Sequence, residues 1–335
     1  MGRDTAKQKV LVTGGAGFLG RAICRALLRE GVEVISYSRG YYPELEAEGI
    51  RCIQGDIVSH RDLLKAASGV SAVFHTAAKA GVWGDYESYY QPNVQGTINV
   101  INICKRLSIP KLIYTSSPSV VFDGKDQEGV DETAPYPDRF LAHYPATKSL
   151  AEQLVIRANS NNLMTCSLRP HLIWGPGDNH LAPRILQKAE QGKLRHIKPF
   201  GKKVDAVYID NAAHAHILAW KKLGPGSPVA GNTYFVTNED PWETDVLINA
   251  IIKAGGRPPV TKSIHARLAR IIGFLCESAF YATKKRHEPP LTRFTASILS
   301  TSHWYNTKKA REELGYKPYV TMEEGLDRLQ ASYGN

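Results

Sequence analysis

The chain has 335 residues, of which 43% are hydrophobic and 22% are charged. This length allows one large domain or two modest ones, at roughly 100–200 residues per domain, and the composition excludes a disordered chain. The formal net charge is +10, from 42 Lys plus Arg against 32 Asp plus Glu. Because no zinc-finger or RNA-binding motif accompanies this basic excess, we expect no nucleic-acid partner.

The five cysteines show neither a CxxC pair nor the spacing of zinc ligands. They are therefore interpreted as reduced thiols of a cytoplasmic protein. His214 and His216 are two residues apart, which places them on different sides of a helix, so we expect no metal site. Residues 1–8 are polar and are predicted to form a disordered leader.

No uncharged apolar run approaches the roughly 20 residues that span a bilayer. The most apolar late stretch, residues 266–282, contains Arg267, Arg270 and Glu277 and is predicted to be an amphipathic helix. An ordinary packed helix is the simpler interpretation. Because Lys284, Lys285 and Arg286 follow it, weak contact with a membrane surface is an alternative.

Strand and helix signals alternate over the first 120 residues. Residues 10–13 form a short buried-strand run, and residues 33–38, 51–55, 72–75 and 112–114 are also predicted to be strands. Apolar residues at helical spacing predict helices around Ala22, Leu63 and Ile98. The composition of residues 118–141 predicts a loop, and a helix over 142–159 and a strand at 165–168 follow. This alternation predicts a parallel sheet that is covered by helices on both faces.

A glycine-rich turn, Thr13-Gly14-Gly15-Ala16-Gly17-Phe18-Leu19-Gly20, follows the first strand and opens the first helix. Glycines at 14, 17 and 20 permit a tight turn, let backbone N–H groups approach a pyrophosphate, and let the helix pack closely on the sheet. Their GxxGxxG spacing differs from the GxGxxG of the standard dinucleotide fingerprint. In this strand–turn–helix context we favour a dinucleotide site over an ordinary turn.

The predicted fold is therefore α/β, with a Rossmann-type doubly wound parallel sheet and a smaller, mostly C-terminal substrate domain. Residues 9–180 plus 205–240 are assigned to the dinucleotide-binding domain. Residues 181–204 plus 241–333 are assigned to the substrate-binding domain.

The end of the second strand indicates which dinucleotide binds. An acidic residue about 20 residues beyond the glycines would bind the ribose hydroxyls of NAD, but the segment here is Ser36-Tyr37-Ser38-Arg39-Gly40. Arg39 can pair with a 2′-phosphate and Ser38 can donate a hydrogen bond to it. This favours NADPH over NAD, the alternative being that Arg39 is a solvated surface residue.

Tyr144 and Lys148 are four residues apart, so they share one face of the predicted helix. A nearby lysine cation lowers the pKa of a tyrosine, and Tyr144 could then protonate a carbonyl oxygen while hydride reaches the carbon. A serine at the end of the fifth strand could hold that oxygen; Ser117 is our choice and Ser116 the close alternative. Alone, Tyr-x-x-x-Lys is most often a solvated helix face.

Together these segments resemble the extended short-chain dehydrogenase/reductase family. The motifs that carry the resemblance occur in family order over nearly the whole chain: residues 13–20, Gly55-Asp56-Ile57, His75-Thr76-Ala77-Ala78, Asn93-Val94-Gln95-Gly96-Thr97, residues 114–117, residues 144–148, Arg169-Pro170 and residues 208–212.

The resemblance implies a role for individual residues and a homodimer. Asp56 and Ile57 would border the adenine, Ala77 and Ala78 would line the cofactor site together with Phe18 and Leu19, and Pro170 would border the nicotinamide. Asn93 would help to order the active site. Ser117, Tyr144 and Lys148 would form the catalytic triad, and Tyr144 and Lys148 would also contact the cofactor.

Within the family the chain looks most like the 3β-hydroxysteroid dehydrogenase branch, on residues 173–178, 290–294 and 303–305. Residues 77–84 and 174–180 are most similar to the bacterial 2-alkyl-3-oxoalkanoate reductases of olefin biosynthesis. The resemblance implies NADPH-dependent reduction of the 3-keto group of a long-chain 2-alkyl-3-oxo acid to the 3-hydroxy acid. The partner would be this small hydrophobic acid or a sterol-like substrate.

Three other functions are weighed against this one. The first is a 3β-hydroxysteroid or sterol-4-carboxylate dehydrogenase. The second is an NAD-dependent nucleotide-sugar epimerase or dehydratase, which Arg39 and the missing acid disfavour. The third is a non-enzymatic redox sensor, which would be expected to lose the Tyr–Lys pair.

A substrate acid would place its carboxylate beta to the reacting oxygen on a large apolar body. A cation in the pocket would bind that carboxylate. Lys79, Arg184 and Arg293 are candidates, although the surface or structural role is favoured for each of them. The sequence leaves the chain length of the substrate, the reaction direction and the stereochemistry open.

Overall fold

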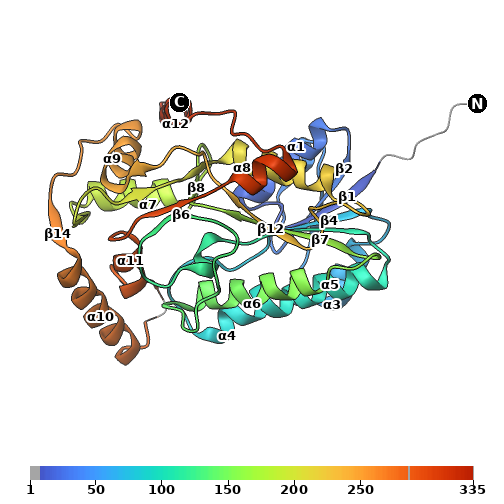
Figure 1. The fold of residues 1–335 in the computed structure, drawn as a ribbon, viewed down its shortest axis with the longest axis horizontal. Coiled ribbons are helices and arrows are strands. Elements are labelled where there is room, and N and C mark those ends of the chain that lie inside the picture. The colour runs from blue at the N-terminus through green and yellow to red at the C-terminus, as the bar shows by residue number, and fades with distance from the viewer. Residues whose placement is uncertain (1–7, 286, 335) are drawn as a thin grey trace, which may run out of the picture.

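A computed structural model describes residues 8–285 and 287–334 (Figure 1). The predicted leader lies outside the described residues except for Gln8, and Arg286 of the basic segment lies outside them too. The strands are β1 (Lys9–Thr13), β2 (Glu33–Ser38), β3 (Arg51–Gln54), β4 (Ala72–His75), β5 (Lys111–Thr115), β6 (Gln127–Val130), β7 (Met164–Pro170), β8 (Ile173–Trp174), β9 (His196–Lys198), β10 (Lys203–Val204), β11 (Val207–Tyr208), β12 (Asn232–Val236), β13 (Trp242–Glu243), β14 (Ser263–His265) and β15 (His303–Tyr305). The helices are α1 (Phe18–Arg29), α2 (Pro43–Ala47), α3 (His60–Ala66), α4 (Tyr86–Tyr90), α5 (Gly96–Arg106), α6 (His143–Arg157), α7 (Leu181–Glu190), α8 (Ile209–Lys222), α9 (Thr244–Ala254), α10 (Ala266–Ala282), α11 (Arg293–Ile298) and α12 (Met322–Tyr333), with short π-helices η1 (Gln91–Gln95) and η3 (Ala310–Leu314) and a 3-10 helix η2 (Pro118–Val121).

A seven-stranded parallel sheet in the order β3-β2-β1-β4-β5-β7-β12 forms the centre of the molecule. Strand β1 shows why helices cover both faces. Val10 and Val12 are buried in one core cluster and Leu11 in the other, because successive side chains of a strand point to opposite faces. In Figure 1, α1 and α8 lie on one side of the sheet and α3, α5 and α6 on the other. The predicted doubly wound α/β fold is confirmed.

A smaller four-stranded sheet, in the order β13-β10-β15-β6, lies beside the large one. Strand β6 lies within residues 118–141, so the prediction of a loop for that whole segment is wrong. It pairs with β15, in the register Gln127↔His303 and Glu128↔Trp304. The local composition gives no signal for this strand, because its partner comes about 175 residues later in the chain.

The helix predicted to carry Val94, Ile98, Ile101 and Ile103 contains a π-helical turn at Gln91–Gln95. Pro92 lies in this turn, and its lack of an N–H group removes one regular helical hydrogen bond. Helices α4, η1 and α5 follow one another directly from residue 86 to residue 106. The widened turn contains Asn93, which is buried.

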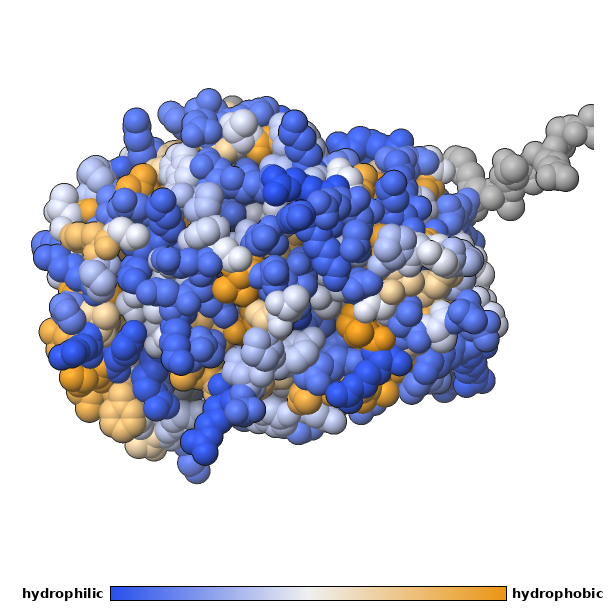
Figure 2. Space-filling model, in the orientation of Figure 1, coloured by the Kyte–Doolittle hydropathy of each residue, from blue (hydrophilic) through white to orange (hydrophobic). Residues whose placement is uncertain are grey.

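Helix α10 is amphipathic, as predicted, but its apolar side faces outward. Its contact with the protein is made by Ala266, Ala269, Gly273 and Glu277. The exposed side chains include Leu268, Ile271, Phe274, Leu275 and Tyr281. In Figure 2, hydrophobic side chains gather at the lower left, where Figure 1 places α10. Among the described residues, no helix is long and apolar enough to cross a membrane.

Candidate active site

The glycine turn is packed so tightly that side chains are excluded from it. Gly14 has a φ of +70°, and its N–H group donates to the carbonyl oxygen of Tyr37 at 2.8 Å. A Cβ on Gly20 would overlap the carbonyl oxygen of Gly14, and a Cβ on Gly14 would lie 2.9 Å from the backbone of Ala77. The turn, α1 and the end of β4 therefore approach one another in a way that only glycine allows.

The beginning of α1 has the features of an anion site. Its N-cap is Gly17, which offers no side-chain hydrogen bond, and its first turn holds no acidic residue. Free N–H groups and the positive end of the helix dipole therefore point outward from this turn. This cradle fits the pyrophosphate of a dinucleotide.

The residues predicted to contact the adenosine half lie at the ends of β2 and β3. The hydroxyl of Ser38 accepts a hydrogen bond from the N–H group of Ala16 at 3.2 Å, which ties β2 to the glycine turn. Arg39 and Asp56 are exposed, and Ile57 is buried. These side chains thus surround the same edge of the sheet as the glycine turn.

Lys148 is the buried cation of the site. Its Nζ donates to the carbonyl oxygen of Thr115 at 2.6 Å and lies 4.1 Å from the centre of the Tyr114 ring. Burial lowers the pKa of Lys148 to about 7, and the carboxylate of Glu152 acts in the opposite direction. Lys148 therefore loses its proton more readily than a lysine in water does.

Tyr144 lies one helical turn before Lys148 on α6. Burial raises the pKa of Tyr144, and the hydroxyl of Ser117 acts against this rise. The expected lowering of the Tyr144 pKa by Lys148 is therefore wrong for the protein alone. The physical reason is that the Lys148 ammonium is engaged by Thr115 and Tyr114, while partial burial of Tyr144 disfavours the charged phenolate.

Both candidate serines lie at the end of β5. The Oγ of Ser117 lies 2.9 Å from the Oγ of Ser119 and also accepts from the Ser119 N–H group. Ser116 is only 4% exposed, and its N–H group donates to Leu168. Ser117 is the serine that affects the pKa of Tyr144, so it stays our first choice.

Asn93 joins the loop after β4 to the catalytic helix. Its Oδ1 accepts from the N–H group of Lys79 at 2.7 Å, and its Nδ2 donates to the carbonyl oxygen of Lys79 and to Oγ1 of Thr147. Thr147 lies on α6 between Tyr144 and Lys148. Asn93 is thus placed to order this region, which the π-helical turn makes possible.

His75 was not singled out as a site residue by the sequence. It lies between Oγ1 of Thr13 at 2.7 Å and Oγ1 of Thr97 at 2.9 Å. Thr97 donates its own proton to Asn93. Burial, with a smaller effect from Lys148, lowers the pKa of His75 to about 3, so the ring is neutral. The His75-Thr76-Ala77-Ala78 motif is the signal that could have found it.

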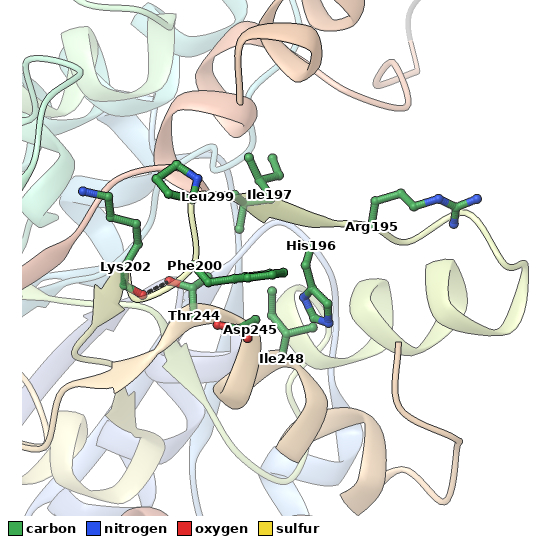
Figure 3. A pocket seen from close by; sticks show the side chains of 10 residues that line it. Arg195, His196, Ile197, Phe200, Lys202, Thr244, Asp245, Ile248 and Leu299 are labelled. Carbon is green, nitrogen blue, oxygen red and sulfur yellow. Dashed lines mark hydrogen bonds between the residues drawn. The ribbon is translucent and has the colours of Figure 1, made fainter. Parts of the chain in front are cut away.

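These residues meet in one open cleft with about 1480 Å³ of empty space, at the carboxyl ends of the strands. Its lining includes Gly14, Gly17, Phe18, Leu19, Gly20, Ala78, Ser116, Ser117, Tyr144, Lys148 and Pro170. Ser38, Arg39, Asp56, Ile57 and Ala77 are outside this lining. A smaller hollow of about 300 Å³, between Phe200, Thr244 and Asp245 (Figure 3), contains none of the predicted site residues.

The model of the 3-beta hydroxysteroid dehydrogenase/isomerase family matches residues 11–265. This chain belongs to that family. It is an NAD(P)-dependent oxidoreductase of the extended short-chain dehydrogenase/reductase type.

Two relatives are similar to this family member over nearly its whole length. A 2-alkyl-3-oxoalkanoate reductase of Stenotrophomonas maltophilia is 49% identical over 97% of this chain and 99% of its own. A protein of the same name from Shewanella oneidensis is 45% identical over 96% of this chain and 85% of its own. In fold, the chain resembles a UDP-glucuronic acid 4-epimerase of Bacillus cereus, with a TM-score of 0.73 at 21% identity over 97% of this chain and 100% of that one.

The three cations considered for a substrate carboxylate are engaged elsewhere in this 3-beta hydroxysteroid dehydrogenase family member. Nζ of Lys79 donates to Ser88 at 2.6 Å and lies over the ring of Tyr89. Arg184 pairs with Glu288, and Arg293 pairs with Glu277 at 2.6 Å. None of the three lines the cleft, which agrees with the surface or structural role that the sequence favoured for each of them over carboxylate binding. Within the described residues, no group of three or more His, Cys, Asp or Glu side chains could hold a metal ion.

Proposed function

We propose that this oxidoreductase uses NADPH to reduce the 3-keto group of a long-chain 2-alkyl-3-oxoalkanoate to the 3-hydroxy acid. The observation that carries the proposal is the 45–49% identity to two reductases of that name over almost the whole chain. The cleft supports it, because its lining contains apolar side chains that suit an alkyl chain: Phe122, Leu172, Ile173, Phe294 and Ile298.

In this proposal the residues of the cleft divide the chemical work. A bound reduced nicotinamide supplies the hydride. Ser117 holds the 3-keto oxygen of the substrate, and the phenol of Tyr144 donates its proton to that oxygen as the carbon is reduced. Lys148 places a positive charge beneath this proton transfer and stabilises the phenolate that Tyr144 leaves behind.

The preference for NADPH rests on Arg39 and Ser38. The exposed guanidinium of Arg39 is free to meet a 2′-phosphate. The Ser38 hydroxyl accepts from Ala16 and keeps its own proton available for donation. Asp56 and Ile57 would border the adenine, and Ala77 and Ala78 would line the cofactor.

We also infer the division into a dinucleotide-binding part, residues 9–180 plus 205–240, and a substrate-binding part, residues 181–204 plus 241–333. Its support is that β12 completes the large sheet, whereas β13 and β15 belong to the smaller one. The same proposal has three further parts. The family resemblance implies a homodimer, and the free cysteines favour a cytoplasmic location. Helix α10 would make weak contact with a membrane surface.

The deciding experiment follows NADPH absorbance with the purified protein and a long-chain 2-alkyl-3-oxo acid, with NADH and the Tyr144→Phe variant beside it. We expect the wild type to consume NADPH. The rate of consumption should be about 10²–10⁴-fold lower in Tyr144→Phe, although this variant still binds the cofactor. Absence of turnover by the folded, NADPH-binding protein would overturn the proposed substrate and favour a sterol acid, which is the next compound to test.

A further inference from the structure

The cleft has a polar corner that the proposed reaction does not yet use. Among the described residues that line the cleft, Lys148 is the only lysine or arginine, and it is held by Thr115. The remaining basic side chains of the lining are His171, His180 and His303. His180 is exposed, whereas His303 is 3% exposed. The ring centre of His171 lies 6.1 Å from that of His303.

Hydrogen bonds to the backbone fix the tautomers of these two rings. Nδ1 of His171 lies 2.9 Å from the carbonyl oxygen of Asp205, which can only accept, so this nitrogen carries the proton. Nε2 of His303 lies 3.0 Å from the carbonyl oxygen of Ile298 and is protonated for the same reason. Among the described residues, neither Nε2 of His171 nor Nδ1 of His303 has a hydrogen-bond partner, and both nitrogens are acceptors while the rings are neutral.

The surroundings keep both rings neutral in the protein alone. Burial, with an added effect of His303, lowers the pKa of His171 to about 3. Burial lowers the pKa of His303 to about 4, and Asp126 works against this. The other ring neighbours are Tyr305, beside His171, and Phe122, beside His303. Burial raises the pKa of the Asp205 carboxyl to about 7, and the contact of Asp205 with His171 is through its backbone carbonyl.

We propose that His171 and His303 form the subsite for the carboxylate of the substrate, and that the pair takes up a proton when the acid binds. The inference rests on the proposed function, because it assumes an acid whose reacting oxygen is at Tyr144. A carboxylate has only acceptor oxygens, and the two free imidazole nitrogens are also acceptors. At least one of these nitrogens must therefore be protonated before it can donate a hydrogen bond to the carboxylate. The negative charge of the bound acid then stabilises the protonated ring, which desolvation otherwise disfavours.

This subsite explains how the cleft can select an acid without an arginine. The apolar wall of Phe122 and Phe294 lies against the histidine corner, since the Phe122 and His303 ring centres are 4.8 Å apart and those of Phe122 and Phe294 are 6.2 Å apart. The corner therefore offers a charge-assisted hydrogen bond on one side and room for an alkyl chain on the other.

The test compares the 2-alkyl-3-oxo acid with its methyl ester in the wild type and in His171→Gln and His303→Gln. A glutamine amide can still donate to the backbone carbonyl but cannot take up a proton. We expect kcat/KM for the acid to fall by about 10–100-fold, the loss of a hydrogen bond to a charged group, while the ester changes by less than about 2-fold. His265→Gln, an exposed histidine at the start of α10, is the matched control and should change neither.

A second measurement separates this inference from the proposed reaction. Calorimetric titration of the NADPH complex with a 2-alkyl fatty acid that has no keto group, in two buffers of different ionisation heat, should show uptake of up to one proton per acid bound. The uptake should be lost in both glutamine variants and with the corresponding amide as the ligand.

The outcomes are distinct. Equal losses for acid and ester, no loss for either, or binding of the fatty acid without proton uptake would each overturn the subsite. Failure of the wild type to reduce both compounds would overturn the proposed function instead, and the calorimetric titration would then still decide whether the histidine pair binds a carboxylate.

Discussion

The carboxylate of Glu152 lies 2.7 Å from Nη2 of Arg169, in an ion pair whose two side chains are 0% and 2% exposed. Ser167 and Tyr136 also donate to this carboxylate. Glu152 lies one turn beyond Lys148 on α6, and Arg169 lies on β7 directly before Pro170. The pair therefore joins the catalytic helix to the strand that ends at the cleft.

Glu152→Gln should destabilise the protein strongly, because it leaves the buried guanidinium of Arg169 without a counter-charge. We expect a loss of about 3–5 kcal/mol in the free energy of unfolding, measured by urea denaturation. Glu30→Gln, which breaks the exposed pair with Lys221, is the control and should cost less than about 1 kcal/mol. Equal effects of the two changes would contradict the structural role of the buried pair.

The pKa of Lys148 should be visible in the pH dependence of stability. The folded protein holds this group at about 7 against an ordinary value of 10.5, so between these pH values the unfolded chain binds more protons than the folded one. Stability therefore rises with pH across that interval, as far as this group is concerned. Urea denaturation at pH 7 and pH 9.5 measures the free energy of unfolding of the wild type and of Lys148→Met. Relative to the variant, the wild type should be more stable at pH 9.5 than at pH 7. A difference that does not change with pH would contradict the lowered pKa.

Arg39→Ala should change the choice of cofactor without harming the fold, because the side chain is exposed. We expect KM for NADPH to rise about 10–100-fold, as for loss of a charge-assisted hydrogen bond, with little change for NADH. Arg51→Ala is the matched control. Arg51 is also exposed, but it begins β3, whereas Arg39 follows the end of the parallel neighbouring strand β2. Parallel kinetics with both cofactors decide the matter, and an unchanged KM for NADPH would assign Arg39 to the solvated surface.

The exposed apolar side of α10 should bind vesicles that contain an anionic lipid. Leu268, Ile271 and Leu275 point outward, and the exposed Arg267 and Lys285 lie at the two ends of the helix. Replacing the three apolar residues by Gln should abolish sedimentation with phosphatidylglycerol vesicles, and salt should weaken the wild-type binding. Val246→Gln, at an exposed apolar site on α9, is the control. Concentration-dependent self-association in place of vesicle binding would indicate a second copy of the chain on this face.

The sequence predicted six of the seven strands of the large sheet, because their signals are local, but it did not predict β12. Glu33–Ser38 and Ala72–His75 are short apolar runs between turn residues, and the structure places β2 and β4 at those bounds. Strand β6 carries no such run, and its position depends on β15. The π-helical turn at Asn93 was likewise missed, because helical periodicity does not report a one-residue widening.

The candidate site follows the same rule. Tyr144 and Lys148 could be placed together because four residues separate them on one helix. Sheet pairing and packing across elements bring together two other pairs, Glu152 with Arg169 and His171 with His303. No local sequence pattern predicts either pair. Lys79, Arg184 and Arg293 were considered because of their charge, but each has a partner that only the tertiary structure provides.

The pairing of β6 with β15 also bears on how this protein is made. The large sheet is complete once residue 236 has left the ribosome, since β12 is its last strand. Phe294, His303 and Tyr305, which line the cleft, emerge about 60 or more residues later. A nascent chain could thus form its cofactor site before the C-terminal part of the cleft lining is present. Strand β6 would have no partner strand until translation nears its end.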